Sequence, residues 1–303
     1  MTGPLVIGHR GASGHRPEHT SLAYRLAWRS GADSVEPDVV STRDGVLVCR
    51  HDLDLALTTD VASRPEFGHK RRRTVLGGVA REGWFVFDFD LDEIRQLRAR
   101  ERWPQRRRTS ARYDDQVGVL TLEELLDLRE RDSARAGRQL GVHVELKHPE
   151  LFEELGLPLH EPLLDLLGSR RLTSPLSPVS VMSFDGRVLE RVRRASDVEL
   201  VRLVGAGEPL RRGRLQRIAA SATAVGLHKG HLLASGERRG HRADEVVSRV
   251  FGAGLELLVW TLVSEVDVTR LLDLGVDGLL TDFPAQAVEL VAGRARPAAA
   301  LTA

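Results

Sequence analysis

The sequence is nearly devoid of cysteine. Cys49 is the only one among 303 residues, which excludes a disulfide framework and a zinc site built from several thiolates of this chain. We expect Cys49, inside the segment VLVCRHD, to be a small buried residue of a strand. The first ten residues lack the basic region and long apolar stretch of a secretory signal, so the sequence predicts a cytoplasmic protein.

Long apolar stretches and an excess of one charge are also missing. No segment approaches the ~18 consecutive apolar residues of a membrane-spanning helix. The 44 Lys and Arg residues almost balance the 43 Asp and Glu residues, and the formal net charge is only +1. Because there is no global field, we expect neither nucleic acid nor an anionic lipid surface as a partner. No feature of the sequence indicates an obligate protein partner.

What the chain does contain is a regular alternation of short apolar, β-rich runs and longer segments with helical periodicity. Continuous apolar runs are typical of parallel strands covered by helices. Repeated about eight times, this pattern predicts an α/β fold, a closed (β/α)8 TIM barrel, as a single domain over residues 1–293 with a flexible tail at 294–303. An open doubly wound sheet is the alternative, but GHRGASGHRPEHT lacks the G-x-G-x-x-G spacing. The predicted strands are 4–10, 33–40, 141–147, 178–184, 198–204, 223–230, 255–263 and 276–282, and the predicted helices are 19–31, 121–132, 160–170, 185–195, 241–254, 265–275 and 284–294.

Residues 53 to about 118 break this alternation. The segment is long, Gly- and Arg-rich and basic in patches, and it follows the second predicted strand and the hairpin after it. We interpret it as a small insertion at the rim of the barrel, with one helix around residues 91–102. The basic runs at 70–73 and 106–108 are predicted to be solvated loop charges, with attraction of an anionic substrate as the weaker alternative.

Three acidic residues fall at the carboxyl ends of neighbouring predicted strands, where a barrel places its working residues. Glu36 and Asp38 share one face of the second strand because side chains alternate with a period of two. Glu145 ends the third strand. Buried carboxylates repel one another unless they are paired, protonated or bound to a cation. Their hard oxygens suit one divalent cation, Ca²⁺ or Mg²⁺; salt bridges to Arg10 or Lys147 are the alternative.

Two histidines are predicted to reach the same end of the barrel. His9 ends the first strand and His51 ends the hairpin that follows the second. Two imidazoles can take a proton on one side of a reacting centre and give one on the other, although either could instead be a core histidine with a satisfied hydrogen bond. Arg10 and Lys147 add charges that suit a phosphoryl group. A phosphometabolite-binding protein would need such cations but not two proton-transfer groups.

Two further histidines remain open at this point. His143 shares a strand face with Glu145 and could support that carboxylate. His228 ends the sixth predicted strand, where contact with substrate and a surface position are equally compatible with the sequence. A barrel metal hydrolase of the amidohydrolase type is excluded, because it would need His-x-His where this chain has His9-Arg10-Gly11.

An ordered set of motifs resembles the glycerophosphodiester phosphodiesterase family. The resemblance extends from about residue 5 to 290, and its insertion looks like that of the longer bacterial branch, whose members are often exported and calcium-dependent. It implies a (β/α)8 barrel and metal-dependent hydrolysis of small glycerophosphodiesters to glycerol 3-phosphate and an alcohol. The motifs are HRGASGHRPEHT, GADSVEPDVVSTRDGVLVCRHD, VELK, VMSFD, VWTL and GVDGLLTDFP.

The resemblance also implies roles for single residues. His19 stands where the family has asparagine, so an imidazole replaces a group that both donates and accepts. Glu18 matches the family and could reach the metal or orient His9. A phospholipase D-like relative that acts on lysolipids is the nearest alternative, and an apolar rim would distinguish it. The implied metal ligands are Glu36, Asp38 and Glu145, the general acid and base are His9 and His51, the phosphate contacts are Arg10 and Lys147, and Trp260 walls the glycerol pocket with Phe184 packed beside it.

Overall fold

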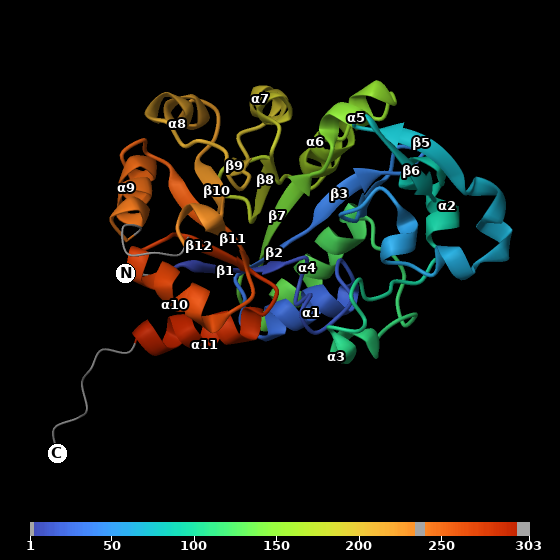
Figure 1. The fold of residues 1–303 in the computed structure, drawn as a ribbon, viewed down its shortest axis with the longest axis horizontal. Helices are drawn as coiled ribbons and strands as arrows, with labels where there is room; N and C mark the ends of the chain where they lie inside the picture. The colour runs from blue at the N-terminus through green and yellow to red at the C-terminus, as the bar shows by residue number, and fades with distance from the viewer. Residues whose placement is uncertain (1–2, 234–239, 296–303) are drawn as a thin grey trace, which may run out of the picture.

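The structure is a computed structural model, and it describes residues 3–233 and 240–295. Its parallel strands close into a barrel, with β1 paired to β12 and β2, and β2 paired to β7. Helices surround the barrel (Figure 1), which confirms the predicted (β/α)8 fold. The strands of the main sheet are β1 (Leu5–His9), β2 (Ser34–Glu36), β3 (Asp38–Ser41), β4 (Leu47–Cys49), β7 (Gly141–Leu146), β8 (Val179–Ser183), β9 (Glu199–Val204), β10 (Ala224–His228), β11 (Glu256–Leu262) and β12 (Gly278–Thr281).

Pro37 divides the second predicted strand into β2 and β3, because proline has no N–H to donate to a neighbouring strand. β2 pairs with β1 and β7, whereas β3 continues along β7 and pairs with the antiparallel β4. The register places His9 opposite Glu36 and Asp38 opposite Glu145. The hydrogen-bond ladder therefore brings two of the predicted metal ligands directly side by side.

The outer helices bury one apolar face against the strands. In α4, a capping box fixes the first turn: Glu124 N donates to Thr121 Oγ1 at 3.0 Å, and Thr121 N donates to the Glu124 carboxylate at 3.0 Å. The helix α8 was not predicted from the sequence, because only Leu215 and Ile218 of it are buried and two residues give no clear period. The helices are α1 (Ser21–Arg29), α4 (Leu122–Ala136), α5 (Pro149–Glu154), α6 (His160–Ser169), α7 (Gly186–Ala195), α8 (Arg212–Ala219), α9 (Gly240–Phe251), α10 (Glu265–Leu274) and α11 (Pro284–Ala295).

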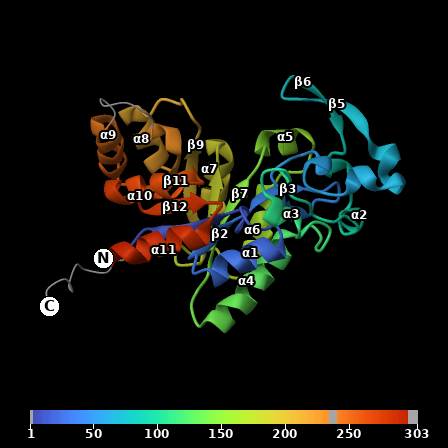
Figure 2. The same cartoon turned by 60° about the horizontal axis from the view of Figure 1, so that its bottom comes forward.

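The chain between β4 and α4 forms a separate body beside the barrel, at the opposite end of the molecule from α9 to α11 (Figures 1 and 2). It contains the two-stranded hairpin of β5 (Arg72–Leu76) and β6 (Val79–Gly83), the short helices α2 (Leu91–Ile94) and α3 (Arg108–Ala111), and several 3-10 turns. This is the insertion after the second strand that the sequence predicts.

The helix predicted around residues 91–102 is wrong beyond Ile94. Tertiary hydrogen bonds replace the helical ones there: Asp60 N donates to Arg98 O at 3.0 Å, and Arg98 N donates to Asp60 Oδ1 at 2.8 Å. The basic run at 106–108 also differs from the prediction of solvated charges, because the Arg107 side chain is only 15% exposed.

A cluster of buried apolar side chains fills the barrel interior beneath the site. Ile7 belongs to it, two residues before His9, and Trp260 packs on it. The cluster is therefore the apolar floor on which the polar strand ends rest. Its members are Ile7, Met182, Val201, Leu203, Ala224, Leu258 and Leu280.

At the carboxyl terminus, α11 extends through Ala295, so the first two residues of the predicted tail are helical. The rest of that tail, residues 296–303, lies outside the described residues. Among the helices of the described chain, none is both long and apolar enough to cross a bilayer.

Candidate active site

Three buried carboxylates converge at the carboxyl ends of β2, β3 and β7. One oxygen from each of Glu36, Asp38 and Glu145 lies within 4.8 Å of the others. Burial, with the charges of Asp38 and Glu145, raises the pKa of Glu36 well above its usual range. Burial likewise raises the pKa of Glu145 to about 8. The cluster predicted from strand-end positions is therefore present, and without a cation it is electrostatically unfavourable.

The salt-bridge alternative also holds for two of the three acids, Asp38 and Glu145. Arg10 Nε lies 3.0 Å from Asp38 Oδ2, and Lys147 Nζ lies 3.5 Å from Asp38 Oδ1 and 2.8 Å from Glu145 Oε1. The Glu36 carboxylate accepts one hydrogen bond, from Arg10 N at 3.1 Å, and within the described chain it has no basic side-chain nitrogen within 4.0 Å. A converging set of hard oxygens with one unpaired buried carboxylate fits a divalent cation.

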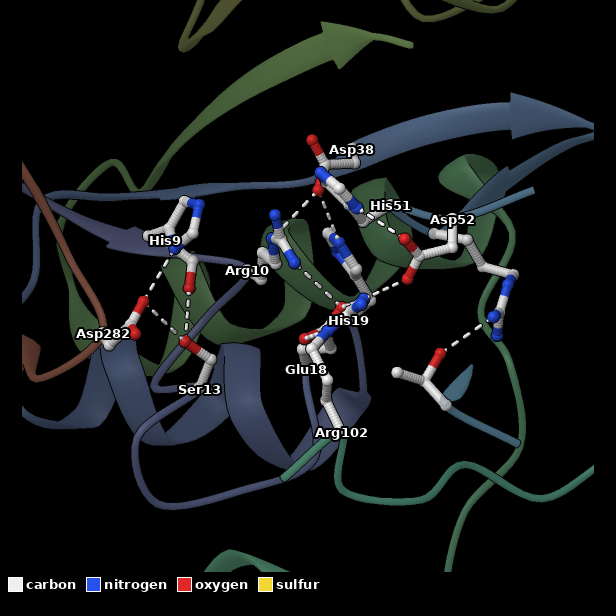
Figure 3. A network of polar contacts seen from close by, with 12 residues as sticks. His9, Arg10, Ser13, Glu18, His19, Asp38, His51, Asp52, Arg102 and Asp282 are labelled. Carbon is white, nitrogen blue, oxygen red and sulfur yellow. Dashed lines mark hydrogen bonds and ion pairs between the residues drawn. The ribbon is translucent and has the colours of Figure 1, made fainter. Parts of the chain in front are cut away.

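Each predicted proton-transfer histidine is held by a carboxylate at Nδ1. His9 Nδ1 donates to Asp282 Oδ1 at 2.7 Å, and His51 Nδ1 donates to Asp52 Oδ1 at 3.0 Å. In Figure 3 the two pairs appear on opposite sides of Arg10. A neutral imidazole with its proton on Nδ1 carries its lone pair on Nε2, so Nε2 is the proton-accepting nitrogen of a neutral ring at both positions.

One cavity of about 300 Å³ lies at this end of the barrel, and it is lined by both histidines and by the basic side chains of Arg10 and Lys147. Trp260 forms part of its wall, with Nε1 donating to Gly226 O at 3.0 Å. Phe184 meets the Trp260 ring edge-on, with 5.4 Å between ring centroids. The cavity is lined by His9, Arg10, His51, Lys147, Phe184, Leu203, Trp260, Thr261 and Leu280.

Comparison with protein-family models matches residues 9–286 to the Glycerophosphoryl diester phosphodiesterase family. The chain belongs to this family. The resemblance seen in the sequence is thereby confirmed, and so is the enzyme class, a phosphoric diester hydrolase acting as a glycerophosphodiester phosphodiesterase.

Individual proteins are similar to this chain in sequence or in fold. The chain is 31% identical over 292 residues to a glycerophosphodiester phosphodiesterase of Bacillus subtilis (strain 168), covering 92% of this chain and 84% of the relative. A structure described as a glycerophosphoryl diester phosphodiesterase from Silicibacter pomeroyi DSS-3 superposes with a TM-score of 0.75 at 25% identity, covering 97% and 95% of the two chains. An Oleispira antarctica phosphodiesterase, solved with the product sn-glycerol-3-phosphate, gives a TM-score of 0.69 at 22% identity, covering 95% and 97%.

His19, where this chain departs from the family motif, supports a predicted metal ligand. Its Nε2 donates to Asp38 Oδ2 at 2.9 Å, and its Nδ1 lies 2.8 Å from the Tyr24 hydroxyl, which donates to it. Burial lowers the pKa of His19 to about 4, so the ring is neutral near pH 7. The imidazole thus orients Asp38 without adding a charge.

Glu18 takes neither of the two roles expected for it. Its carboxylate lies 3.0 Å from Arg10 Nη1 and 2.6 Å from Arg102 Nη2, apart from the metal-ligand cluster. His9 is oriented by Asp282 instead. The position of Asp282 at the end of the last barrel strand was the signal from which this partner could have been found.

The two open histidines lie outside the cavity lining. His228 Nδ1 accepts from Gly230 N at 3.0 Å, and its ring meets Trp260 edge-on. His143 Nδ1 lies 2.7 Å from Ser34 Oγ rather than against Glu145. His143 therefore does not support Glu145 as suggested; the register pairs Ser34 with Gly141, and the His143 ring reaches the Ser34 hydroxyl from two residues further along β7.

Glu18 should make the fold sensitive to acid. Burial alone would raise its pKa, but Arg10 and Arg102 hold the pKa well below its usual range. A depressed folded-state pKa adds stability above the unfolded-state value and loses it as the pH falls toward the folded one. We expect Glu18→Gln to flatten the pH dependence of the unfolding free energy below about pH 4.3, by up to ~1.4 kcal/mol per pH unit.

Urea unfolding of both proteins at a series of acidic pH values measures this slope. The matched control is Glu190→Gln, an exposed residue of α7, which should leave the slope unchanged. Equal slopes for wild type and Glu18→Gln would show that the pairing with Arg10 and Arg102 does not keep this carboxyl ionised.

Proposed function

We propose that this chain hydrolyses glycerophosphodiesters to glycerol 3-phosphate and an alcohol, with His9 and His51 as the proton-transfer groups. The observation that carries the proposal is the pair of histidine–carboxylate contacts facing one cavity that Arg10 and Lys147 also line. The sn-glycerol-3-phosphate held by the similar Oleispira antarctica phosphodiesterase supports this choice of product.

Glu36, Asp38 and Glu145 would hold one divalent cation, Ca²⁺ or Mg²⁺. Their converging oxygens and the unpaired, buried carboxylate of Glu36 support this assignment. When bound, such a cation withdraws negative charge from phosphoryl oxygens. All three residues are buried.

The substrate carries a free glycerol hydroxyl next to its phosphate ester, and this hydroxyl is the nucleophile we propose. One histidine takes the hydroxyl proton as the new P–O bond forms, and the other gives a proton to the alcohol oxygen as the old P–O bond breaks. Water then opens the cyclic phosphate with the two roles reversed. Holding the hydroxyl in line with phosphorus is worth up to ~10 kcal/mol of the barrier.

Arg10 and Lys147 are the phosphate contacts in this proposal. Burial would lower the pKa of each, but the neighbouring acids raise both well above their usual values. Both side chains therefore stay charged, and they can stabilise the charge that develops on the non-bridging oxygens. Trp260 and Phe184 provide an apolar wall for the carbon skeleton of the glycerol.

A wide groove next to the cavity favours a second candidate substrate, a lysophospholipid. The groove has a volume of about 920 Å³ and shares His51, Lys147 and Phe184 with the cavity. It runs between the hairpin tip and α5, and its apolar lining includes Leu53, Leu57, Leu76, Val79, Phe85 and Leu151. The sequence indicated a basic insertion without an apolar rim, whereas this groove gives a leaving alcohol room and apolar surface.

The decisive assay measures release of glycerol 3-phosphate from glycerophosphocholine. We expect turnover that a chelator abolishes and added Mg²⁺ or Ca²⁺ restores. A substrate whose neighbouring hydroxyl is replaced by hydrogen should be cleaved at least about 10²-fold more slowly, because it lacks the intramolecular nucleophile.

Three results would contradict parts of this proposal. Full activity in chelator would exclude the cation. Rapid cleavage of the deoxy substrate would indicate direct attack by water. If the catalytic efficiency kcat/KM for lysophosphatidylcholine exceeds that for glycerophosphocholine, the second substrate class replaces the first.

A further inference from the structure

Two arginines of the insertion reach into the site described above. Arg102 donates two hydrogen bonds to the Glu18 carboxylate, from Nε to Oε2 at 2.9 Å and from Nη2 to Oε1 at 2.6 Å. The same Nη2 also donates to Asp52 Oδ2 (Figure 3). The other oxygen of Asp52 holds His51. Arg102 therefore contacts the carboxylate that holds His51, one of the two proposed proton-transfer groups.

Arg107 makes the equivalent contacts on the other side. Its Nη1 donates to Ser13 O at 2.9 Å, and its Nη2 donates to Asp282 Oδ2. Asp282 Oδ1 holds His9, and it also accepts from Ser13 Oγ at 3.0 Å. In both halves of the site, one carboxylate oxygen therefore binds the histidine and the other binds an arginine.

The segment between the two arginines is a tight turn. The backbone N–H groups of Arg106 and Arg107 both donate to Trp103 O, at 2.9 and 2.8 Å. Both guanidinium groups also lie over the Trp103 ring, with 5.6 Å for Arg102 and 4.9 Å for Arg107 between the guanidinium carbon and the ring centroid. The Glu101 carboxylate accepts hydrogen bonds from Trp103 N in the turn and from Ser110 Oγ in α3, and so links the turn to that helix.

We infer that residues 102–107 act as a brace: Arg102 and Arg107 fix the carboxylates of Asp52 and Asp282, and thereby the orientation of His51 and His9. The inference depends on the proposed roles of the two histidines. A carboxylate bound only by an imidazole can rotate about its side-chain bonds, whereas one bound on both oxygens is held in a single orientation. Arg102 and Arg107 are positioning residues, because neither lines the cavity.

Burial and charge favour this role over attraction of substrate. The Arg102 and Arg107 side chains are 12% and 15% exposed, and both are paired with acids. Burial would raise the pKa of Asp52, but hydrogen bonds with His51 and Arg102 lower it well below its usual range. The carboxylate therefore stays ionised as an acceptor for the Nδ1 proton of His51.

The test is to truncate each arginine and separate kcat from KM. We expect Arg102→Ala and Arg107→Ala each to lower kcat for glycerophosphocholine about 10- to 100-fold, with KM changed less than about 3-fold, since misplacing a reacting group by 1 Å can cost ~10²-fold. Guanidinium ion at millimolar concentration should restore part of the lost kcat. The matched control, Arg106→Ala, removes an exposed charge of the same turn and should leave both constants unchanged.

Double-mutant cycles show through which carboxylate each arginine affects kcat. Arg102→Ala should cost little more in a protein that already carries Asp52→Asn, yet its full effect should persist with Asp282→Asn. Arg107→Ala should show the reverse pattern. Arg102→Lys keeps the charge but cannot bridge Glu18 and Asp52 as a guanidinium does, so a kcat loss in this folded variant also supports the brace.

Other results overturn the inference. A rise in KM at constant kcat in Arg102→Ala would mean that the arginine attracts the anionic substrate. Wild-type kcat in both Arg102→Ala and Arg102→Lys would mean that the contacts do not orient His51. A wild-type enzyme that releases no glycerol 3-phosphate would instead contradict the proposed function itself, so the two failures are distinguishable.

Discussion

Replacing His51 with alanine should lower kcat for glycerophosphocholine by about 10²- to 10⁴-fold, the usual contribution of a positioned acid or base. The physical reason is that Asp52, the carboxylate bound to His51, cannot take over its proton. Asp52 is tied to Arg102, and its pKa is held well below the usual range, so it is ionised and too weak a base near neutral pH. KM should change little, because Arg10 and Lys147 still contact the phosphate in the proposed complex.

A steady-state assay of glycerol 3-phosphate release checks this expectation. The control is His69→Ala, which removes an exposed histidine of the insertion and should leave kcat unchanged. Near-full turnover by His51→Ala would mean that His51 does not transfer a proton. A loss seen equally in His69→Ala would mean instead that the insertion is generally sensitive to substitution.

Replacing Glu36 with glutamine should reduce kcat/KM at least about 10²-fold, because even residues that only support a metal ligand cost 10- to 100-fold when changed. The same substitution should stabilise the cation-free protein. Glu36 has its pKa raised by burial and by the charges of Asp38 and Glu145, so removing its charge relieves repulsion while Arg10 N keeps an oxygen acceptor. Activity and stability should therefore move in opposite directions.

Thermal unfolding with and without Mg²⁺ or Ca²⁺ separates the two effects. Wild type should be stabilised by about 2.7 kcal/mol when the cation is present at 100 times its Kd, and Glu36→Gln should gain far less. Glu82→Gln, an exposed acid of the β5–β6 hairpin, is the control and should respond as wild type does. Equal stabilisation of wild type and Glu36→Gln would place the cation elsewhere or exclude it.

The parts of the fold that depend on local pattern were predictable from the sequence. Strands of a parallel barrel are buried on both sides, so they appear as apolar runs, and their carboxyl ends meet at one face. That geometry alone predicts that Glu36, Asp38 and Glu145 lie close together. The interruption at Pro37 changes the pairing of the strand but leaves both acids facing the same cluster.

The partners contributed by the insertion were not predictable in this way. The path of residues 95–110 is set by tertiary hydrogen bonds such as those between Asp60 and Arg98, and no periodicity records them. Arg102 and Arg107 look like two more arginines in a basic stretch until the fold brings them to Asp52 and Asp282. Strand-end position predicts which groups come from the barrel, but not which groups arrive from outside it.

The β5–β6 hairpin forms its own small sheet, apart from the barrel, and contributes Leu76 and Val79 to the groove beside the site. The groups proposed to move protons come from the strand ends and from the hairpin of β3 and β4, and the turn that holds them is a different part of the insertion. In the proposed function, contact with the alcohol and the chemistry of the phosphate would therefore come from separate pieces of chain. Substitutions at the hairpin tip should therefore alter the groove without disturbing the groups proposed for the reaction.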